Sequence, residues 1–149
     1  MTAKTILVPV DFSDVTPSVA EVASSIAAAF GGKIILLHVE EPEPAFVGFE
    51  PGPLPVQAAV DRDTRMMQGQ LDELCIQLRK KGLEVEARDV EGPVAERIRE
   101  ESDTREVDLI VMGSHGHGAI YNLLVGSVTS GVLKEAPCPV LVVPAQKRK

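Results

Sequence analysis

The feature that most constrains the fold is a regular alternation of short apolar runs with amphipathic helical stretches. Residues 6–10 (ILVPV) and 33–39 (KIILLHV) are almost wholly apolar, as in strands buried on both faces of a sheet. Between these runs, apolar residues recur at helical spacing from Val19 to Phe30, and glycines follow at 31 and 32. We expect Thr16 to be the N-cap and Pro17 the first residue of this helix. A strand–helix–strand unit of this kind predicts parallel pairing through a right-handed crossover.

The same alternation continues to the end of the chain. Val60 to Leu78 has the spacing of an amphipathic helix, and in residues 83–88 apolar positions alternate with charged ones, which is typical of an edge strand. Pro93 opens a short helix, Val107 to Met112 is a further buried strand, and residues 139–144 form the last strand after another helix. The glutamates at 84, 86, 100 and 101 are expected to form a solvated face. We therefore predict an α/β fold: an open parallel five-stranded sheet with helices on both faces and strand order 3-2-1-4-5, forming one domain over residues 1–149.

Composition excludes several classes of protein. A formal net charge of −7 argues against general binding to nucleic acid or to an anionic membrane. No apolar stretch is long enough to span a bilayer and no leader peptide is evident, so we expect a cytoplasmic protein. Cys75 and Cys138 are the only cysteines and lack metal-ligand spacing, so they are expected to be small core residues in a reducing compartment. The proline-rich segment from Glu41 to Pro55 is expected to be a surface loop, with a flap or partner contact as the less favoured alternative.

In open α/β sheets, ligands bind beyond the carboxyl ends of the strands, where the direction of winding reverses. In the predicted strand order this point lies between the first and fourth strands, so Asp11 and Gly113 are expected to face each other across a crevice. Asp11 could accept hydrogen bonds from the hydroxyls of a ribose. It could equally cap the following turn through the amides of Ser13 or Asp14, and strand position alone leaves both open.

A glycine-rich segment, VMGSHGHGAIYNLLVGSVTSG, follows the fourth predicted strand. It is neither a Walker A loop nor a GxGxxG dinucleotide fingerprint. It could bind phosphate in the same way as those motifs, because Gly113 and Gly116 allow the backbone to approach an anion with its amides pointing inward. Gly126 and Ser127 open the last helix, whose N-terminus favours phosphate, and Ser127 and Thr129 are expected to add hydroxyl donors.

These motifs resemble the universal stress protein family. The likeness covers essentially the whole chain, including LVPVDFS at the start, LLHVEEP, VEGPVAERI and APCPVLVVP at the end. ATP-binding members of the family carry the pattern G-x2-G-x9-G-[ST], which Gly113, Gly116, Gly126 and Ser127 match without a gap. The resemblance implies a Rossmann-like, adenine nucleotide alpha hydrolase-like fold and a role as a nucleotide-dependent module in the stress response.

The resemblance also implies a site, residue by residue. Asp11 would bind ribose, Val39 would meet adenine through its backbone, and the glycine segment would follow the phosphates. The full expected binding set is Pro9, Val10, Asp11, Val39, Met112, Gly113, His115, Gly116, His117, Gly126, Ser127, Val128 and Thr129. The expected ligand is ATP, or AMP or ADP, with Mg²⁺ or Mn²⁺ held mainly by phosphates and water. The family further pairs the last strand, here Val140 to Val143, with its copy in a homodimer.

The chain departs from the family where the nine-residue spacer, HGAIYNLLV, lacks Lys and Arg. This departure predicts modest affinity or a less charged nucleotide such as AMP, with His117 adding charge when protonated. His115 and His117 have no acidic partner in the loop, so we expect no protein metal site and no catalytic role for them. Three functions stay open: a nucleotide-dependent dimer, a slow ATPase acting as a timer, and a nucleotide-independent interaction or chaperone-like dimer. A phosphoacceptor receiver domain is rejected, because Pro144 and Ala145 stand where it needs a lysine.

Overall fold

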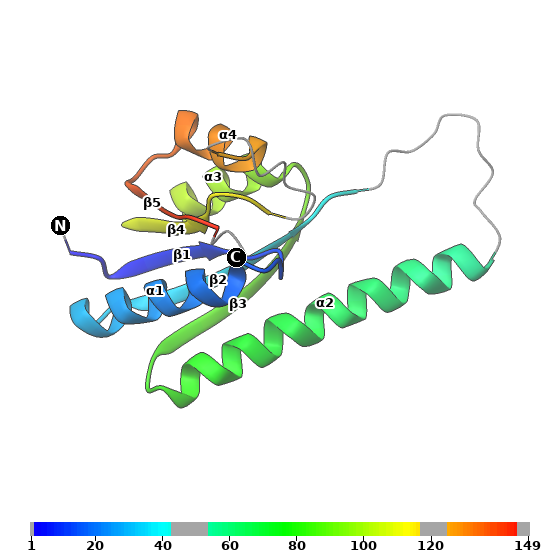
Figure 1. Cartoon of the computed structure of the whole chain (residues 1–149), viewed down its shortest axis with the longest axis horizontal. Coiled ribbons are helices and arrows are strands. Elements are labelled where there is room, and N and C mark those ends of the chain that lie inside the picture. Colours follow the sequence, from blue (N-terminus) through cyan, green and yellow to red (C-terminus); the bar gives the residue numbers. More distant parts are fainter. Residues whose placement is uncertain (1, 43–53, 117–124, 146–149) are drawn as a thin grey trace.

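The chain folds as an open parallel sheet flanked by helices, in a computed structural model that describes residues 2–42, 54–116 and 125–145. The strands lie in the order β3-β2-β1-β4-β5, and every pairing is parallel, as predicted (Figure 1). In chain order the elements are β1 (Thr5–Pro9), α1 (Thr16–Phe30), β2 (Lys33–Glu40), α2 (Leu54–Lys80), β3 (Glu84–Glu91), α3 (Val94–Thr104), β4 (Leu109–Gly113), α4 (Ser127–Glu135) and β5 (Val140–Val143).

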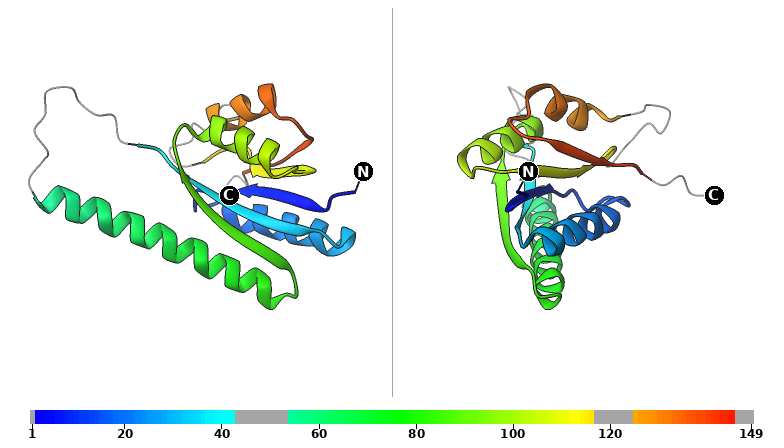
Figure 2. Two further views of the ribbon diagram at one scale, coloured as in Figure 1. Left: turned by 180° about the vertical axis from the view of Figure 1, so that it is seen from behind. Right: turned by 90° about the vertical axis from the view of Figure 1, so that its left-hand side faces the viewer.

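Helices cover both faces of the sheet, α1 and α2 on one side and α3 and α4 on the other (Figure 2). Successive strand residues point to opposite faces, so Ile6 and Val8 contact the α1–α2 layer while Leu7 contacts the α3–α4 layer. All three side chains are fully buried. The continuous apolar runs seen in the sequence are therefore explained by two cores, one on each face.

The ends of two helices differ from the prediction. The N-cap of α1 is Val15, and the predicted N-cap Thr16 is instead the first helical residue, with its amide donating to the Ser13 carbonyl at 3.0 Å. Proline follows at the second position, where its missing N–H costs nothing. The second helix begins at Leu54, so Pro55, which was expected in the loop, lies in the first turn of α2. The rest of the predicted loop, residues 43–53, lies outside the described part of the chain.

The edge strand β3 shows why its charged residues alternate with apolar ones. Its Val85 packs under α2, whereas Glu86 and Arg88 face α3. Arg88 lies 2.8 Å from Glu101 and Arg105 lies 2.6 Å from Glu86, which forms an ion-pair network between the strand and the helix. The hydrogen bond to Glu101 raises the pKa of Arg88 above its already high ordinary value. The expectation of a simple solvated face was thus wrong for Glu101, whose side chain is only 12% exposed beside Arg88, whereas Glu86 is 45% exposed and also pairs with an arginine.

The cysteines behave as small packing residues. Cys75 of α2 is buried in the core, and Cys138 lies half-buried before β5. Burial raises the pKa of both thiols, so both stay protonated at neutral pH. Within the described ranges, no helix is long and apolar enough to cross a membrane.

Candidate ligand site at the switch point of the sheet

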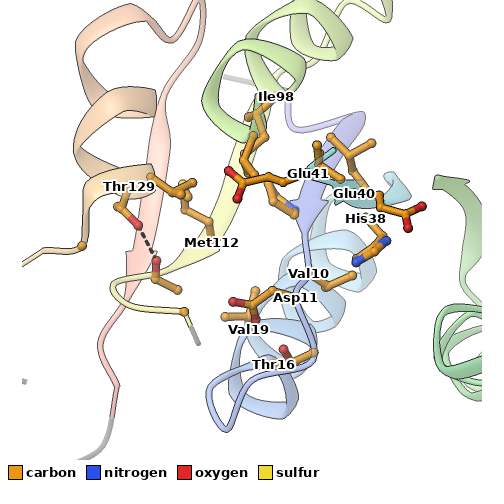
Figure 3. Close-up of a pocket in the computed structure, with 18 of the residues that line it drawn as sticks. Val10, Asp11, Thr16, Val19, His38, Glu40, Glu41, Ile98, Met112 and Thr129 are labelled. Carbon is orange, nitrogen blue, oxygen red and sulfur yellow. Dashed lines mark hydrogen bonds between the residues drawn. The ribbon is translucent and has the colours of Figure 1, made fainter. Parts of the chain in front are cut away.

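A cavity of about 730 Å³ opens at the carboxyl ends of β1, β2 and β4 (Figure 3). Chain winding reverses here, since β2 and β3 lie on one side of β1 and β4 and β5 lie on the other. Ligands of open α/β sheets bind at this position. Besides the strand ends, the lining includes residues of α1, α2, α3 and α4, and the volume is that of a small-molecule site.

The structure brings together nearly all of the residues that the sequence singled out. The residues of the expected set that line the cavity are Pro9, Val10, Asp11, Val39, Met112, Gly113, His115, Gly116, Gly126, Ser127, Val128 and Thr129. They come from three separate segments, which meet only because β1 lies between β2 and β4. The remaining member, His117, lies outside the described residues.

Asp11 directly follows β1 and is held in a tight turn. Its Oδ1 accepts a hydrogen bond from the Ser13 amide at 2.9 Å, as in the capping alternative considered from the sequence. The next residue, Phe12, has φ of 59°, a left-handed conformation that costs energy for a non-glycine residue. The turn aims the carboxylate at the cavity, which Asp11 lines. Capping and ligand contact are therefore compatible, because Oδ1 accepts the Ser13 amide while Oδ2 lies on the side of Gly116.

Two glycines of the motif are needed because neighbouring side chains lie too close to leave room for a Cβ, and not because their backbone angles are unusual. A Cβ on Gly116 would lie 2.2 Å from Asp11 Oδ2, and a Cβ on Gly113 would lie 2.6 Å from Val15 Cγ1. Gly126 is different, since a Cβ there would make an ordinary contact of 3.4 Å with the Ser114 carbonyl. Asp11 and Gly113, which were expected to face each other across a crevice, both line the cavity, and Gly116 is the glycine whose added Cβ would meet Asp11.

Ser114, which the sequence analysis did not single out, connects the glycine segment to β5. Its amide donates to the Val143 carbonyl and its carbonyl accepts from the Gly126 amide. Its buried hydroxyl accepts from the Ala145 amide and lies 2.9 Å from His115 Nδ1. No motif marks this serine, because its backbone partners Val143, Gly126 and Ala145 are more than ten residues away.

The start of α4 forms one wall of the cavity. Ser130 makes the first helical bond, to the Gly126 carbonyl, so the amides of residues 127–129 precede the hydrogen-bonded turns. Thr129 differs from expectation: its buried hydroxyl donates to the Gly113 carbonyl at 2.8 Å. This bond fixes α4 to the end of β4, so the hydroxyl is not a spare donor for a ligand.

The opposite wall is formed by β2, β3 and α2, and the sequence analysis singled out only Val39 in it. His38 Nδ1 donates to Asp89 Oδ1 at 3.0 Å, and the His38 ring lies 5.7 Å from the ring of Phe12. Thr64 of α2 donates to Glu40 Oε1 at 2.9 Å. These pairs depend on register, since His38 stands directly opposite Asp89 across the β2–β3 pairing. A register of this kind is not visible in the sequence.

The backbone of β2 also faces the cavity. Leu37 turns its carbonyl toward β1, where it accepts the Val10 amide at 2.8 Å. In a parallel pair, peptide groups alternate in direction every residue, so those of Val39 face the same side as those of Leu37. Strand β1 has ended at that level, and Val39 therefore presents its N–H and C=O beyond the strand, where it lines the cavity.

The charge of the lining is strongly one-sided. Among the described lining residues there is no Lys or Arg, and the five carboxylates are Asp11, Glu40, Glu41, Asp63 and Asp89. Four of them lie on the β2–β3–α2 side, while the start of α4 offers amides and the positive end of a helix dipole. Within the described ranges, no group of three or more histidine, cysteine or acidic side chains could hold a metal ion.

Comparison with known proteins agrees with this geometry. Residues 2–144 match the universal stress protein family. Universal stress protein MJ0531 of Methanocaldococcus jannaschii is 32% identical over 98% of this chain and 85% of its own length. The structure of universal stress protein UspA from Lactobacillus plantarum superposes with a TM-score of 0.83 at 26% identity, covering 96% of this chain and 99% of that one. A universal stress protein crystallised with cAMP superposes with a TM-score of 0.66 at 27% identity, covering 97% and 98%. The chain belongs to the universal stress protein family.

Proposed function

We propose that the cavity binds an adenine nucleotide and that the chain is a nucleotide-dependent regulatory module. The observation that carries this proposal is the meeting of Gly113, Gly116, Gly126 and Ser127 with Asp11 around one cavity at the switch point. Phosphates are assigned to the amides at the start of α4, the ribose to Asp11, and the base to the apolar surface of Val10, Val39 and Met112.

The charge of the lining favours a nucleotide that carries few negative charges. Five carboxylates and no fixed cation among the described lining residues oppose a triphosphate more than a monophosphate. The related protein bound to cAMP, a nucleotide with a single negative charge, supports the same direction. With ATP, the added charge would be offset by Mg²⁺ or Mn²⁺ held mainly by the phosphates and water. We therefore expect AMP to bind without metal and ATP to depend on it.

Calorimetric titration with AMP and ATP, each with and without Mg²⁺, tests this assignment. Binding of AMP without metal, and a gain in ATP affinity on adding Mg²⁺, are the expected results. Titration with inorganic phosphate is the control for simple anion binding and should give much weaker binding than AMP. An absence of binding by every adenine nucleotide would refute the proposed function.

We propose nucleotide holding rather than rapid hydrolysis. Phosphoryl transfer needs fixed positive charge around the transferred group, and the described lining has no Lys or Arg to supply it. Nucleotide released by heat from freshly purified protein identifies the state that is held. Recovered ATP or AMP that persists during incubation agrees with holding, whereas conversion of added ATP to ADP within minutes would favour the ATPase alternative.

The open edge of β5 supports the proposed homodimer. Pro139 and Val143 turn their carbonyls toward β4, so the peptide groups of Val140 and Val142 face away from the sheet. Val142→Pro removes one outward N–H and leaves the pairing with β4 intact. Light scattering should give twice the 16.0 kDa chain mass for the natural protein and the single mass for the variant. Equal masses for the two proteins would argue against pairing through this strand.

A further inference from the structure

The helix α2 divides into two parts with different surroundings. From Leu71 onward it is anchored to the sheet, with Leu71, Cys75 and Leu78 buried in the core beneath it. None of residues 61–70 is buried. In the ribbon views this end of α2 runs past the sheet and away from the other helices (Figures 1 and 2). Residues 61–70, which we call the first part of the helix, therefore have little tertiary packing to stabilise them.

The few inward contacts of the first part are with the cavity. Thr64 and Met67 are half-buried and line it, together with the exposed Asp63. A side-chain hydrogen bond connects this part to the sheet, from Thr64 to Glu40 at the end of β2. Met66, next to Met67, points outward and is 65% exposed. One face of the unanchored part of α2 is thus a wall of the ligand cavity.

A glycine marks the boundary between the two parts. Gly69 stands inside the helix, where glycine costs about 1 kcal/mol relative to alanine. No packing reason accounts for it, because a Cβ built there would meet nothing within 4 Å and its φ is not in the left-handed region. A glycine without a steric role at such a boundary weakens the helix where its tertiary support ends.

We propose that residues 61–68 of α2 form a movable wall of the nucleotide cavity, which pivots at Gly69 and closes on the bound ligand through Met67 and Thr64. This inference rests on the proposed function. The wall has a carboxylate at Asp63 and lies across the cavity from the start of α4, so it closes on the base and not on the phosphates. Met67 supplies an apolar, polarisable surface that suits the face of a purine. Closure of this wall on the ligand would order residues 61–68.

Hydrogen exchange with and without saturating AMP tests the closure directly. The amides of residues 61–68 should become protected by AMP, whereas those of residues 71–80 should not change. AMP binding by calorimetry without protection of residues 61–68 would overturn the movable wall and leave the proposed function intact. An absence of AMP binding would instead refute the proposed function.

Two matched pairs of variants test the parts played by single residues. Met67→Ala should weaken AMP binding about tenfold, whereas Met66→Ala, with the same chemical change on the outward face, should leave it unchanged. Gly69→Ala should tighten AMP binding up to about fivefold, because it reduces the cost of ordering the wall before the ligand arrives. Its control, Gln68→Ala, alters an exposed neighbouring position and should have no effect. Equal effects of Met66→Ala and Met67→Ala, or unchanged affinity in Gly69→Ala, would contradict the proposal.

Discussion

The two walls of the cavity are built in different ways. The wall of β4 and α4 is held by hydrogen bonds that all end on backbone groups: the Ser114 amide and carbonyl connect Val143 to Gly126, and the Thr129 hydroxyl donates to the Gly113 carbonyl. The wall of β2, β3 and α2 is held by side chains, in the pairs His38–Asp89 and Thr64–Glu40. The first wall offers amides and a helix N-terminus, while the second offers carboxylates.

The difference separates two tasks in binding a nucleotide. Phosphates need closely placed amides at defined positions, and backbone hydrogen bonds with close glycine contacts supply that precision. A base needs surface contact and hydrogen-bond acceptors, which side chains on a partly unsupported helix can supply. We call the wall of β4 and α4 the glycine wall and the wall of β2, β3 and α2 the acidic wall. We expect substitutions on the glycine wall to have larger effects on nucleotide affinity and stability than substitutions on the acidic wall.

Gly116→Ala tests the close contact of the glycine wall and should have the largest effect. The new Cβ would lie 2.2 Å from Asp11 Oδ2, so either the loop or the Asp11 turn must move. Strain of about 1–3 kcal/mol corresponds to a loss of AMP affinity of about fivefold to about 150-fold. Gly126→Ala is the matched control, because its Cβ has room, and calorimetry should show a change of less than about threefold. The comparison of the walls fails if both variants bind like the natural protein.

Thr129→Val tests the hydrogen bond that fixes α4. Valine keeps the shape of the buried side chain but leaves the Gly113 carbonyl without this donor, which should cost about 1–3 kcal/mol of the free energy of unfolding. The measurement is urea unfolding, with AMP affinity recorded in parallel. Ser127→Ala, at an exposed position of the same helix, should leave the free energy of unfolding within about 0.5 kcal/mol of the natural value. An unchanged midpoint in Thr129→Val would show that α4 is held by other contacts.

Asp63→Asn tests the acidic wall and should have the smallest effect. It removes one exposed carboxylate from the lining, which should strengthen ATP binding about twofold to threefold at low salt. The gain should shrink at high salt, where exposed charges are screened. The matched control is Asp61→Asn, which removes an exposed carboxylate of the same helix that does not line the cavity. Equal gains in ATP affinity in the two variants would show that only the net charge of the protein matters, and not the position of Asp63 in the acidic wall.

Much of the fold could be predicted from local patterns. The strands at 6–10 and 33–39 are almost wholly apolar, and the glycines at 31 and 82 end helices where the periodicity stops. The element order and the parallel pairing follow from these patterns and from the handedness of crossovers, whereas the same rules also allow strand orders other than the predicted 3-2-1-4-5. The first residue of α1 was misplaced by one, because Val15 caps the helix without a side-chain signature.

Of the candidate site, too, the part that depends on local sequence could be predicted and the rest could not. Its glycine wall could be predicted, since Gly113, Gly116, Gly126 and Ser127 occupy one continuous segment at a defined spacing. Its acidic wall could not, because Asp89, Glu40 and Thr64 are far apart in the sequence and carry no motif. Their meeting depends on the register of β2 with β3 and on the length of α2.

The sequence by itself determined the alternation of strands and helices, the two-faced burial of the sheet, and the position of the ligand cavity at its switch point. These depend on local periodicity and on general rules of chain crossing, which act on neighbouring residues. Only the tertiary structure decided that Gly116 lies close to Asp11, that Thr129 is committed to a carbonyl, and that α2 lines one side of the cavity. Those outcomes depend on distances between segments that are remote in the chain, and packing alone sets such distances.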